Sequence, residues 1–280
     1  MSDAIGRVSL ADVQANPDGR QVPIAKVGVQ NIRFPIMVKD RRRAAQHTVA
    51  TIDMSVDLPH HFKGTHMSRF MEILNSHDGV ISGEALPGIM RTMRERLDAE
   101  TAQLRVSFPY FMEKRAPVSG SAGLLSYDCA FEASSGAGDD FVLTVRVPVT
   151  TLCPCSREIS SRGAHNQRGL VTVKARFTGE LWIEDVVALV DDSASCGLYP
   201  VLKRADEKWV TERAYDNPRF VEDLVREVTL RLRAMERVTW FKVHVVNYES
   251  IHEHDAYAEV EETKGVRNGE TRGSRRASPS

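Results

Sequence analysis

The chain has 280 residues, of which 42% are hydrophobic and 27% are charged, and its formal net charge is -1. These values are typical of a globular protein in water and give no general argument for nucleic acid or a membrane as a partner. No apolar run approaches the ~20 residues of a membrane span, and the N-terminus lacks the apolar core of a signal peptide, so we expect a cytoplasmic protein. Four cysteines are too few for a disulfide scaffold, and reduced thiols are expected.

The first half of the chain predicts strands that are buried on one face. Residues 1–22 are polar and predict a flexible segment with a turn at 16–19. Apolar and polar residues then alternate in several stretches, as in half-buried antiparallel strands; in one of them Ile52, Met54 and Val56 share a face. The predicted strands lie near 23–38, 47–57, 104–110 and 124–132.

Two helices are predicted between the second and third of these strands. Thr65 can cap the first helix and Ser82 the second, because each hydroxyl side chain precedes an apolar stripe of helical period. The stripe residues are Met67, Phe70, Met71 and Leu74 in the first helix and Leu86, Met90, Met93 and Leu97 in the second.

The same order returns after a loop at 134–140. Alternation predicts strands near 141–147, 171–177, 238–248 and 256–261. Two helices are predicted between the second and third of these strands. The first carries Trp182, Val186, Leu189 and Val190 on one side; the second begins at Asn217-Pro218, a capping residue followed by proline, and its stripe runs to Met235.

Each half therefore reads strand-strand-helix-helix-strand-strand, over about 23–134 and 140–262. A four-stranded sheet would leave exposed edges, so we expect the halves to join into one antiparallel sheet covered by helices, a single bimodular α+β domain over 23–262. Oligomerisation could close this sheet into a barrel. Residues 263–280 are rich in Gly, Ser and Arg and predict a disordered tail, with contact to RNA as the less favoured alternative.

The most informative stretch is 150–169, where Cys153 and Cys155 flank Pro154 and His165 follows. Thiolate and imidazole are ligands that a borderline divalent metal prefers. Proline predicts a stiff, extended turn, which is too tight for both sulfurs to bind one metal. One sulfur would bind the metal and the other would face a substrate. The alternative, two buried apolar cysteines, fits poorly with the polar surroundings.

This stretch carries a family resemblance. L-C-P-C-S-R-E-I-S followed by G-A-H-N-Q-R-G resembles the signature of the prokaryotic type IB GTP cyclohydrolases, metal enzymes of the GTP cyclohydrolase I family with the tunnelling fold. Further matches are K-G-T-H-M-S-R-F (63–70), Y-P-V-L-K-R-A-D-E-K-W-V-T-E (199–212) and N-Y-E-S-I-H-E-H (247–254). The resemblance implies a barrel that closes on oligomerisation, with active sites between subunits, and we expect a homotetramer.

The resemblance also implies a reaction: hydrolysis of GTP to formate and 7,8-dihydroneopterin triphosphate, the first step of folate biosynthesis and a source for deazaguanine nucleosides. One divalent metal, Zn, Mn or Fe, would be held by Cys153, His165 and Glu207. Two alternatives are a tunnelling-fold nitrile reductase that acts on a deazaguanine and a non-catalytic metal-binding protein.

The remaining roles follow from the same motifs. Cys155 would lie beside the substrate, with a second metal-ligand role as its alternative. Glu249 and His252 would act as general acid and base. Glu222 would bind the two adjacent N–H donors of guanine, although the role of a helix-terminal acid is nearly as good an interpretation. Without the resemblance, Glu207 would be interpreted as an exposed loop carboxylate. The candidate triphosphate ligands are His66, Arg69, Arg168, Lys203 and Arg204.

Overall fold

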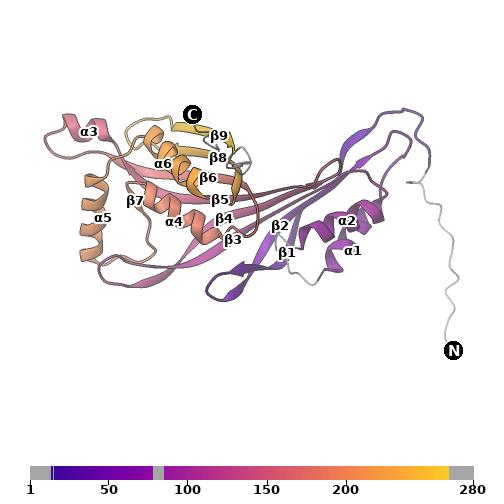
Figure 1. The fold of residues 1–280 in the computed structure, drawn as a ribbon, viewed down its shortest axis with the longest axis horizontal. Coiled ribbons are helices and arrows are strands. Elements are labelled where there is room, and N and C mark those ends of the chain that lie inside the picture. The colour runs from indigo at the N-terminus through magenta and orange to yellow at the C-terminus, as the bar shows by residue number, and fades with distance from the viewer. Residues whose placement is uncertain (1–13, 15, 78–84, 265–280) are drawn as a thin grey trace, which may run out of the picture.

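In a computed structural model, which describes residues 14, 16–77 and 85–264, the chain forms one long antiparallel sheet with helices packed against one face (Figure 1). The strands of the described residues are β1 (Ile24–Asp40), β2 (Ala44–Leu58), β3 (Ala102–Arg115), β4 (Ala122–Ser135), β5 (Asp140–Leu152), β6 (Asn166–Phe177), β7 (Cys196–Gly197), β8 (Val238–Asn247) and β9 (Ala256–Thr263). The helices of the described residues are α1 (Met67–Asn75), α2 (Leu86–Leu97), α3 (Pro154–Ile159), α4 (Ile183–Ser193), α5 (Arg204–Asp216) and α6 (Val221–Ala234).

The sheet joins the two halves of the chain through the β4–β5 pair. Its order is β1-β2-β3-β4-β5-β6-β8-β9, and the short β7 pairs with β5. The predicted α+β architecture, with strand-strand-helix-helix-strand-strand in the first half, is confirmed. The second half adds α3, β7 and α5 to that plan. Closure of the sheet into a barrel stays a prediction.

One face of the sheet is apolar in every central strand. Antiparallel pairing sets six residues in a transverse row, and all of them are buried: Ile52, Val106, Phe131, Leu143, Ala175 and Phe241. The helices α1 and α2 cover this face in the first half, and α4 and α6 cover it in the second (Figure 1). Because the row is continuous, the two halves share one hydrophobic core.

The opposite face of the sheet carries cross-strand ion pairs. Glu132 on β4 lies 3.2 Å from Arg105 on β3 and 3.1 Å from Lys174 on β6. Arg176 on β6 binds Asp140 on β5 through two hydrogen bonds of 2.5 and 2.8 Å. These side chains line a hollow of about 1030 Å³. The alternation predicted from sequence therefore separates an apolar face from a charged one.

Two helices differ from the sequence prediction. The stretch after Cys153, predicted as an extended turn, begins the short helix α3, because Pro154 occupies the first helical position, where its missing N–H costs nothing. The helix α5 was not predicted, since it has no apolar stripe; its buried residues are only Asp206 and Ala214.

The predicted helix starts also need correction. The helix α6 begins at Val221 rather than at Asn217-Pro218, because the Asn217 amide donates to the carbonyl oxygen of Ala194, at 2.8 Å, instead of capping the helix. His66, not Thr65, precedes α1. In α1, Phe70, Ile73 and Leu74 are buried, whereas Met67 and Met71 are exposed.

Some predictions fall on residues outside the described ranges: the Ser82 cap, most of the segment 1–22 and nearly all of the tail 263–280. The stripe of α2, in contrast, is confirmed, with Leu86, Met90, Met93 and Leu97 all buried. Among the described residues, no helix is both long and apolar enough to cross a membrane.

The ion pair between Asp140 and Arg176 generates a pH-dependent prediction. The hydrogen bond from Arg176 lowers the pKa of the Asp140 carboxyl. A carboxyl whose pKa is lower in the folded state stabilises the fold above its unfolded pKa of ~3.9, and this contribution is lost as the pH falls through the lower folded value. Asp140→Asn should therefore lower the free energy of unfolding in urea at pH 7 by about 0.2–1 kcal/mol, because the pair is partly exposed.

The same difference should be smaller at about pH 3 than at pH 7, because the Asp140 carboxyl of the unfolded chain is then largely protonated. Asp139→Asn is the matched control, since Asp139 forms no ion pair with any described residue. A loss of stability in Asp140→Asn that is equal at both pH values would contradict the prediction.

Candidate active site

The candidate site lies where β5 ends and α3 begins. Cys153 follows the last residue of β5 and caps α3, and its sulfur accepts a hydrogen bond from the Ser156 amide at 3.5 Å. Cys153 is half-buried, whereas Cys155 is exposed. Residues two apart at the start of a helix point in different directions. This geometry agrees with separate roles for the two thiols, which stay predictions.

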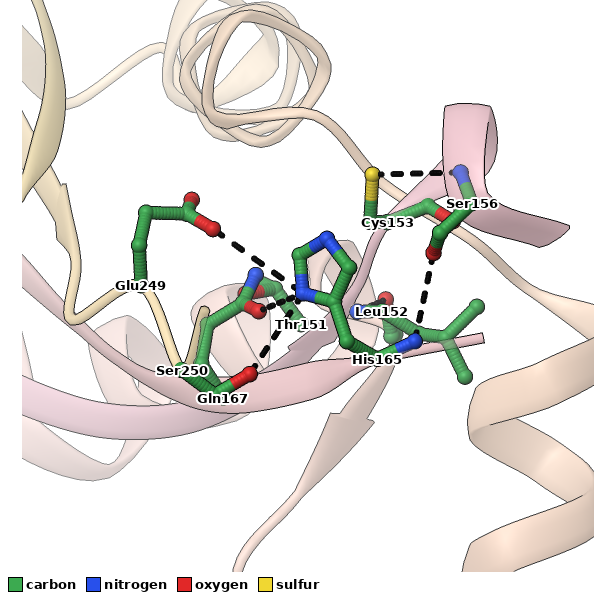
Figure 2. A network of polar contacts seen from close by, with 9 residues as sticks. Thr151, Leu152, Cys153, Ser156, His165, Gln167, Glu249 and Ser250 are labelled. Atoms are coloured by element: carbon green, nitrogen blue, oxygen red, sulfur yellow. Dashed lines mark hydrogen bonds and ion pairs between the residues drawn. The ribbon is translucent and has the colours of Figure 1, made fainter. Parts of the chain in front are cut away.

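His165 lies beside Cys153 because β5 and β6 are antiparallel neighbours. The last pair of their ladder is Leu152 with Asn166, and the Cys153 amide then donates to the His165 carbonyl oxygen at 3.1 Å. Figure 2 shows the imidazole of His165 and the sulfur of Cys153 on the same side of this strand end. Two residues on either side of α3 are thus brought together by strand pairing.

The orientation of the His165 ring is set by Gln167. The Nδ1 atom lies 3.0 Å from Gln167 Oε1, and the Gln167 side-chain amide donates to Thr151 Oγ1 at 3.0 Å (Figure 2). With the Gln167 oxygen directed at the ring, this contact favours the tautomer in which Nδ1 carries the proton. The lone pair of the neutral imidazole is then on Nε2. In a metal-binding histidine, one ring nitrogen usually binds the metal and the other donates a hydrogen bond to a neighbouring group.

Glu249 joins this pair from the end of β8. Its carboxylate lies 4.0 Å from His165 Nδ1, and both side chains are 14% exposed. Ser250 Oγ lies 3.5 Å from the same nitrogen (Figure 2). Strand pairing again explains the contact, since the Tyr248 amide donates to the Arg168 carbonyl oxygen and so carries the end of β8 alongside β6. The structure thus brings Cys153, His165 and Glu249 together.

Among the described residues, His252 and Glu222 form no hydrogen bond or ion pair with Cys153, His165 or Glu249. The His252 ring stacks on His254, with ring centroids 5.0 Å apart, in an exposed loop after β8. Glu222 is exposed in the first turn of α6, and the Arg219 amide, just before that helix, donates to the Leu152 carbonyl oxygen at 3.0 Å. The start of α6 is therefore tied to the end of β5, next to Cys153.

Glu207 is exposed on α5 and is not gathered with the two predicted ligands. Among the described residues, no three His, Cys, Asp or Glu side chains form a cluster that could hold a metal ion. The donor chemistry of Cys153 and of the His165 Nε2 atom fits a borderline divalent metal. The role of Glu207 as the third ligand stays a prediction. The described residues of one chain do not bring it together with Cys153 and His165.

The start of α5 is held by its neighbour Asp206. This carboxylate is 0% exposed and accepts hydrogen bonds from the Val118, Ser119 and Lys203 amides, each at 2.8 Å, and from the Ser119 hydroxyl at 2.6 Å. Burial raises the pKa of Asp206, but these hydrogen bonds outweigh it and hold the pKa well below its ordinary value. The turn between β3 and β4 thereby anchors the helix that carries Glu207.

The candidate triphosphate ligands divide into two groups. Arg168, Lys203 and Arg204 are exposed on β6 and at the start of α5, in the same half of the chain as Cys153. His66 and Arg69 belong to α1 and its start, and α1 lies at the opposite end of the sheet from α3 (Figure 1). Arg69 donates to the Arg96 carbonyl oxygen there. One chain does not bring the two groups together.

Several residues of the site were not predicted from the sequence. Ser156, Gln167, Thr151 and Ser250 form most of the polar contacts around Cys153 and His165. A signal for Gln167 was present in the G-A-H-N-Q-R-G motif. Residues two apart on a strand share a face, so Gln167 could have been expected to lie beside His165.

The chain matches the family model described as type I GTP cyclohydrolase folE2 over residues 10–258. It is 53% identical over 264 residues to GTP cyclohydrolase FolE2 of Citrifermentans bemidjiense, covering 94% of this chain and 99% of that one. It is 56% identical to GTP cyclohydrolase FolE2 of Pelobacter propionicus, covering 90% and 98% of the two chains. The solved structure of urate oxidase from Bacillus subtilis 168 aligns with 85% of this chain and 98% of its own, with a TM-score of 0.46 and 11% sequence identity.

The geometry predicts unequal roles for the two thiols in metal binding. Cys153→Ala and His165→Ala should each lose bound metal, because each removes a donor from the paired strand ends. Cys155→Ala should retain it, since the exposed thiol points elsewhere. The measurement is elemental analysis of Zn, Mn and Fe after dialysis of each purified variant. Stoichiometric metal in Cys153→Ala, or its absence in Cys155→Ala, would reverse the assignment.

Proposed function

Because the chain belongs to the type I GTP cyclohydrolase FolE2 family, we propose that it hydrolyses GTP to formate and 7,8-dihydroneopterin triphosphate, the first step of folate biosynthesis. The matching model describes the FolE2 family, which is distinct from the GTP cyclohydrolase I family that the sequence resemblance also implied. The observation that carries the proposal is the contact of Cys153 with His165 in a chain of this family.

The proposed site would hold one divalent metal through Cys153 Sγ and His165 Nε2. When bound, such a metal polarises the reacting carbon and lowers the pKa of water. Gln167 would hold the imidazole with Nε2 directed at the metal, through the 3.0 Å contact at Nδ1. Glu207 is the proposed third ligand; Zn and Fe suit the thiolate and the imidazole, and Mn suits the carboxylate.

Proton transfer is assigned to the groups around this pair. Glu249, with its carboxylate 4.0 Å from His165 Nδ1, would hold or move a proton as the guanine imidazole ring opens. Cys155 would present its exposed thiol to the substrate, and His252 would act as the second acid or base.

The proposed assembly is a homotetramer in which sites are shared between chains. Its support is that β1 and β9 form the two edges of the sheet in the described part of the chain. Exposed edges favour pairing with another copy. A second copy could also supply the α1 cations, His66 and Arg69, which lie at the other end of the sheet from Cys153.

Assembly can be tested by multi-angle light scattering of the purified protein. We expect the mass of a homotetramer, and activity confined to that species. The same column fractions are assayed with GTP. A monomer with full turnover would rule out shared sites.

The activity itself can be tested with GTP and added Zn²⁺ or Mn²⁺. We expect formate release and, after oxidation, pterin fluorescence, both abolished by chelation. A nitrile reductase or a non-catalytic metal-binding protein would give neither signal.

Base selection by Glu222 gives a sharper test. Guanine offers a carboxylate two adjacent donors, whereas adenine presents an unprotonated ring nitrogen. That mismatch costs on the order of 2–5 kcal/mol, so ATP should compete at least roughly thirtyfold less well than GTP. Glu222→Gln should raise the KM for GTP, because the amide offers only one acceptor oxygen. The difference in affinity between GTP and ATP should become smaller.

Glu227→Gln, on the same helix, is the matched control and should behave as the wild type. Unchanged GTP kinetics in Glu222→Gln would return Glu222 to the role of a helix-terminal acid.

A further inference from the structure

We propose that Ser156 is a positioning residue that fixes the separation between Cys153 and His165. The inference rests on the proposed function, in which those two side chains hold the metal. Ser156 would contact neither metal nor substrate and would act only through the two ligands.

The hydroxyl and the amide of Ser156 both contact this pair, whereas its carbonyl oxygen accepts from the Ser160 amide at 3.1 Å within the helix. Its hydroxyl donates to the Cys153 carbonyl oxygen at 3.2 Å and accepts from the His165 amide at 3.2 Å (Figure 2). Its own amide donates to Cys153 Sγ at 3.5 Å. One side chain therefore links both ligands, in addition to the hydrogen bond from the Cys153 amide to the His165 carbonyl oxygen.

The hydroxyl of Ser156 compensates for a weak helix cap. The N-cap of a helix usually supplies an oxygen acceptor, but α3 has a sulfur, which is a weak one. The short helix is therefore poorly anchored by its cap. The bridge from Ser156 to the His165 amide ties α3 to the start of β6, and it leaves the sulfur available to a metal.

Removal of this hydroxyl has unequal consequences for the two ligands. The Cys153 carbonyl would keep a second donor, the Arg157 amide at 3.2 Å. The His165 amide would lose its acceptor, and the His165 backbone would then be held to Cys153 by one hydrogen bond, from the Cys153 amide, instead of by this bond and the Ser156 bridge. The ring would still be held by Gln167 at Nδ1. Ser156→Ala should thus keep both ligands but change the distance between the Cys153 sulfur and the His165 ring.

The chain offers a matched control directly after the same helix, at its C-cap Ser160. The Ser160 hydroxyl also accepts a backbone hydrogen bond, from the Arg162 amide at 3.2 Å, but it contacts neither Cys153 nor His165. Ser160→Ala therefore removes a similar hydrogen bond from the other end of α3. If Ser156 only stabilised the helix, the two alanine variants would have similar effects on metal binding.

The experiment measures the Kd for Zn²⁺ by equilibrium dialysis of the metal-free full chain, together with its Tm. Loss of a residue that orients a metal ligand commonly weakens metal affinity about 10- to 100-fold, and we expect Ser156→Ala to fall in this range. Ser156→Thr, which keeps the hydroxyl, should restore the affinity to near that of the wild type. Ser160→Ala should bind Zn²⁺ as the wild type does.

Two results would overturn the proposal: wild-type affinity in Ser156→Ala, or equal weakening in Ser160→Ala. Cys153→Ala, measured alongside, distinguishes failure of the positioning proposal from failure of the proposed function. If Cys153→Ala keeps its metal, the ligand set itself is wrong. If Cys153→Ala loses the metal while Ser156→Ala binds normally, only the positioning role is wrong.

Discussion

The register of β5 against β6 is the constraint on which the candidate site depends. Thr151 lies opposite Gln167 and Leu152 opposite Asn166, so the next position sets Cys153 opposite His165. A shift of one residue would turn each side chain to the other face of the sheet. The apolar row through Leu143, Ala175 and Phe241 prevents such a shift, because it would expose the core. Core packing thereby fixes the position of two polar side chains at the far end of the ladder.

The pairing of β6 with β8 places the end of β8 in the same way. Gly169 on β6 lies opposite Asn247, and a Cβ atom at Gly169 would come within 3.0 Å of the Asn247 side chain and 3.2 Å of Val149. Three strands therefore approach closely at this point, where a side chain would separate them. Because β8 remains close to β6, Glu249 reaches His165 just beyond the last pair. The acid, the imidazole and the thiol come from three neighbouring strand ends.

The two faces of the sheet explain why the chemistry lies at its end. One face is covered by helices and is apolar, and the other pairs its acids with its bases across strands. Both faces thus leave few polar groups without partners. At the strand ends the ladder stops, and side chains such as Cys155 and His252 are exposed. Loops at the ends of a rigid scaffold are where binding groups can vary without loss of the core.

The sequence by itself determined the local features of this protein. Alternation predicted the strands that carry Ile52, Leu104 and Val171, and helical period predicted the stripe of α2, because both patterns repeat over a few residues. The motif around Cys153 and His165 also indicated the family. Only the tertiary structure decided what depends on distant partners. It made α5 a helix anchored by Asp206 rather than by an apolar stripe, and it set α1 at the opposite end of the sheet from Cys153. It also gave Ser156 and Gln167 their contacts with His165. Strand register and hydrogen bonds between distant segments leave no periodic signal in the sequence, since they arise only when the whole sheet is assembled.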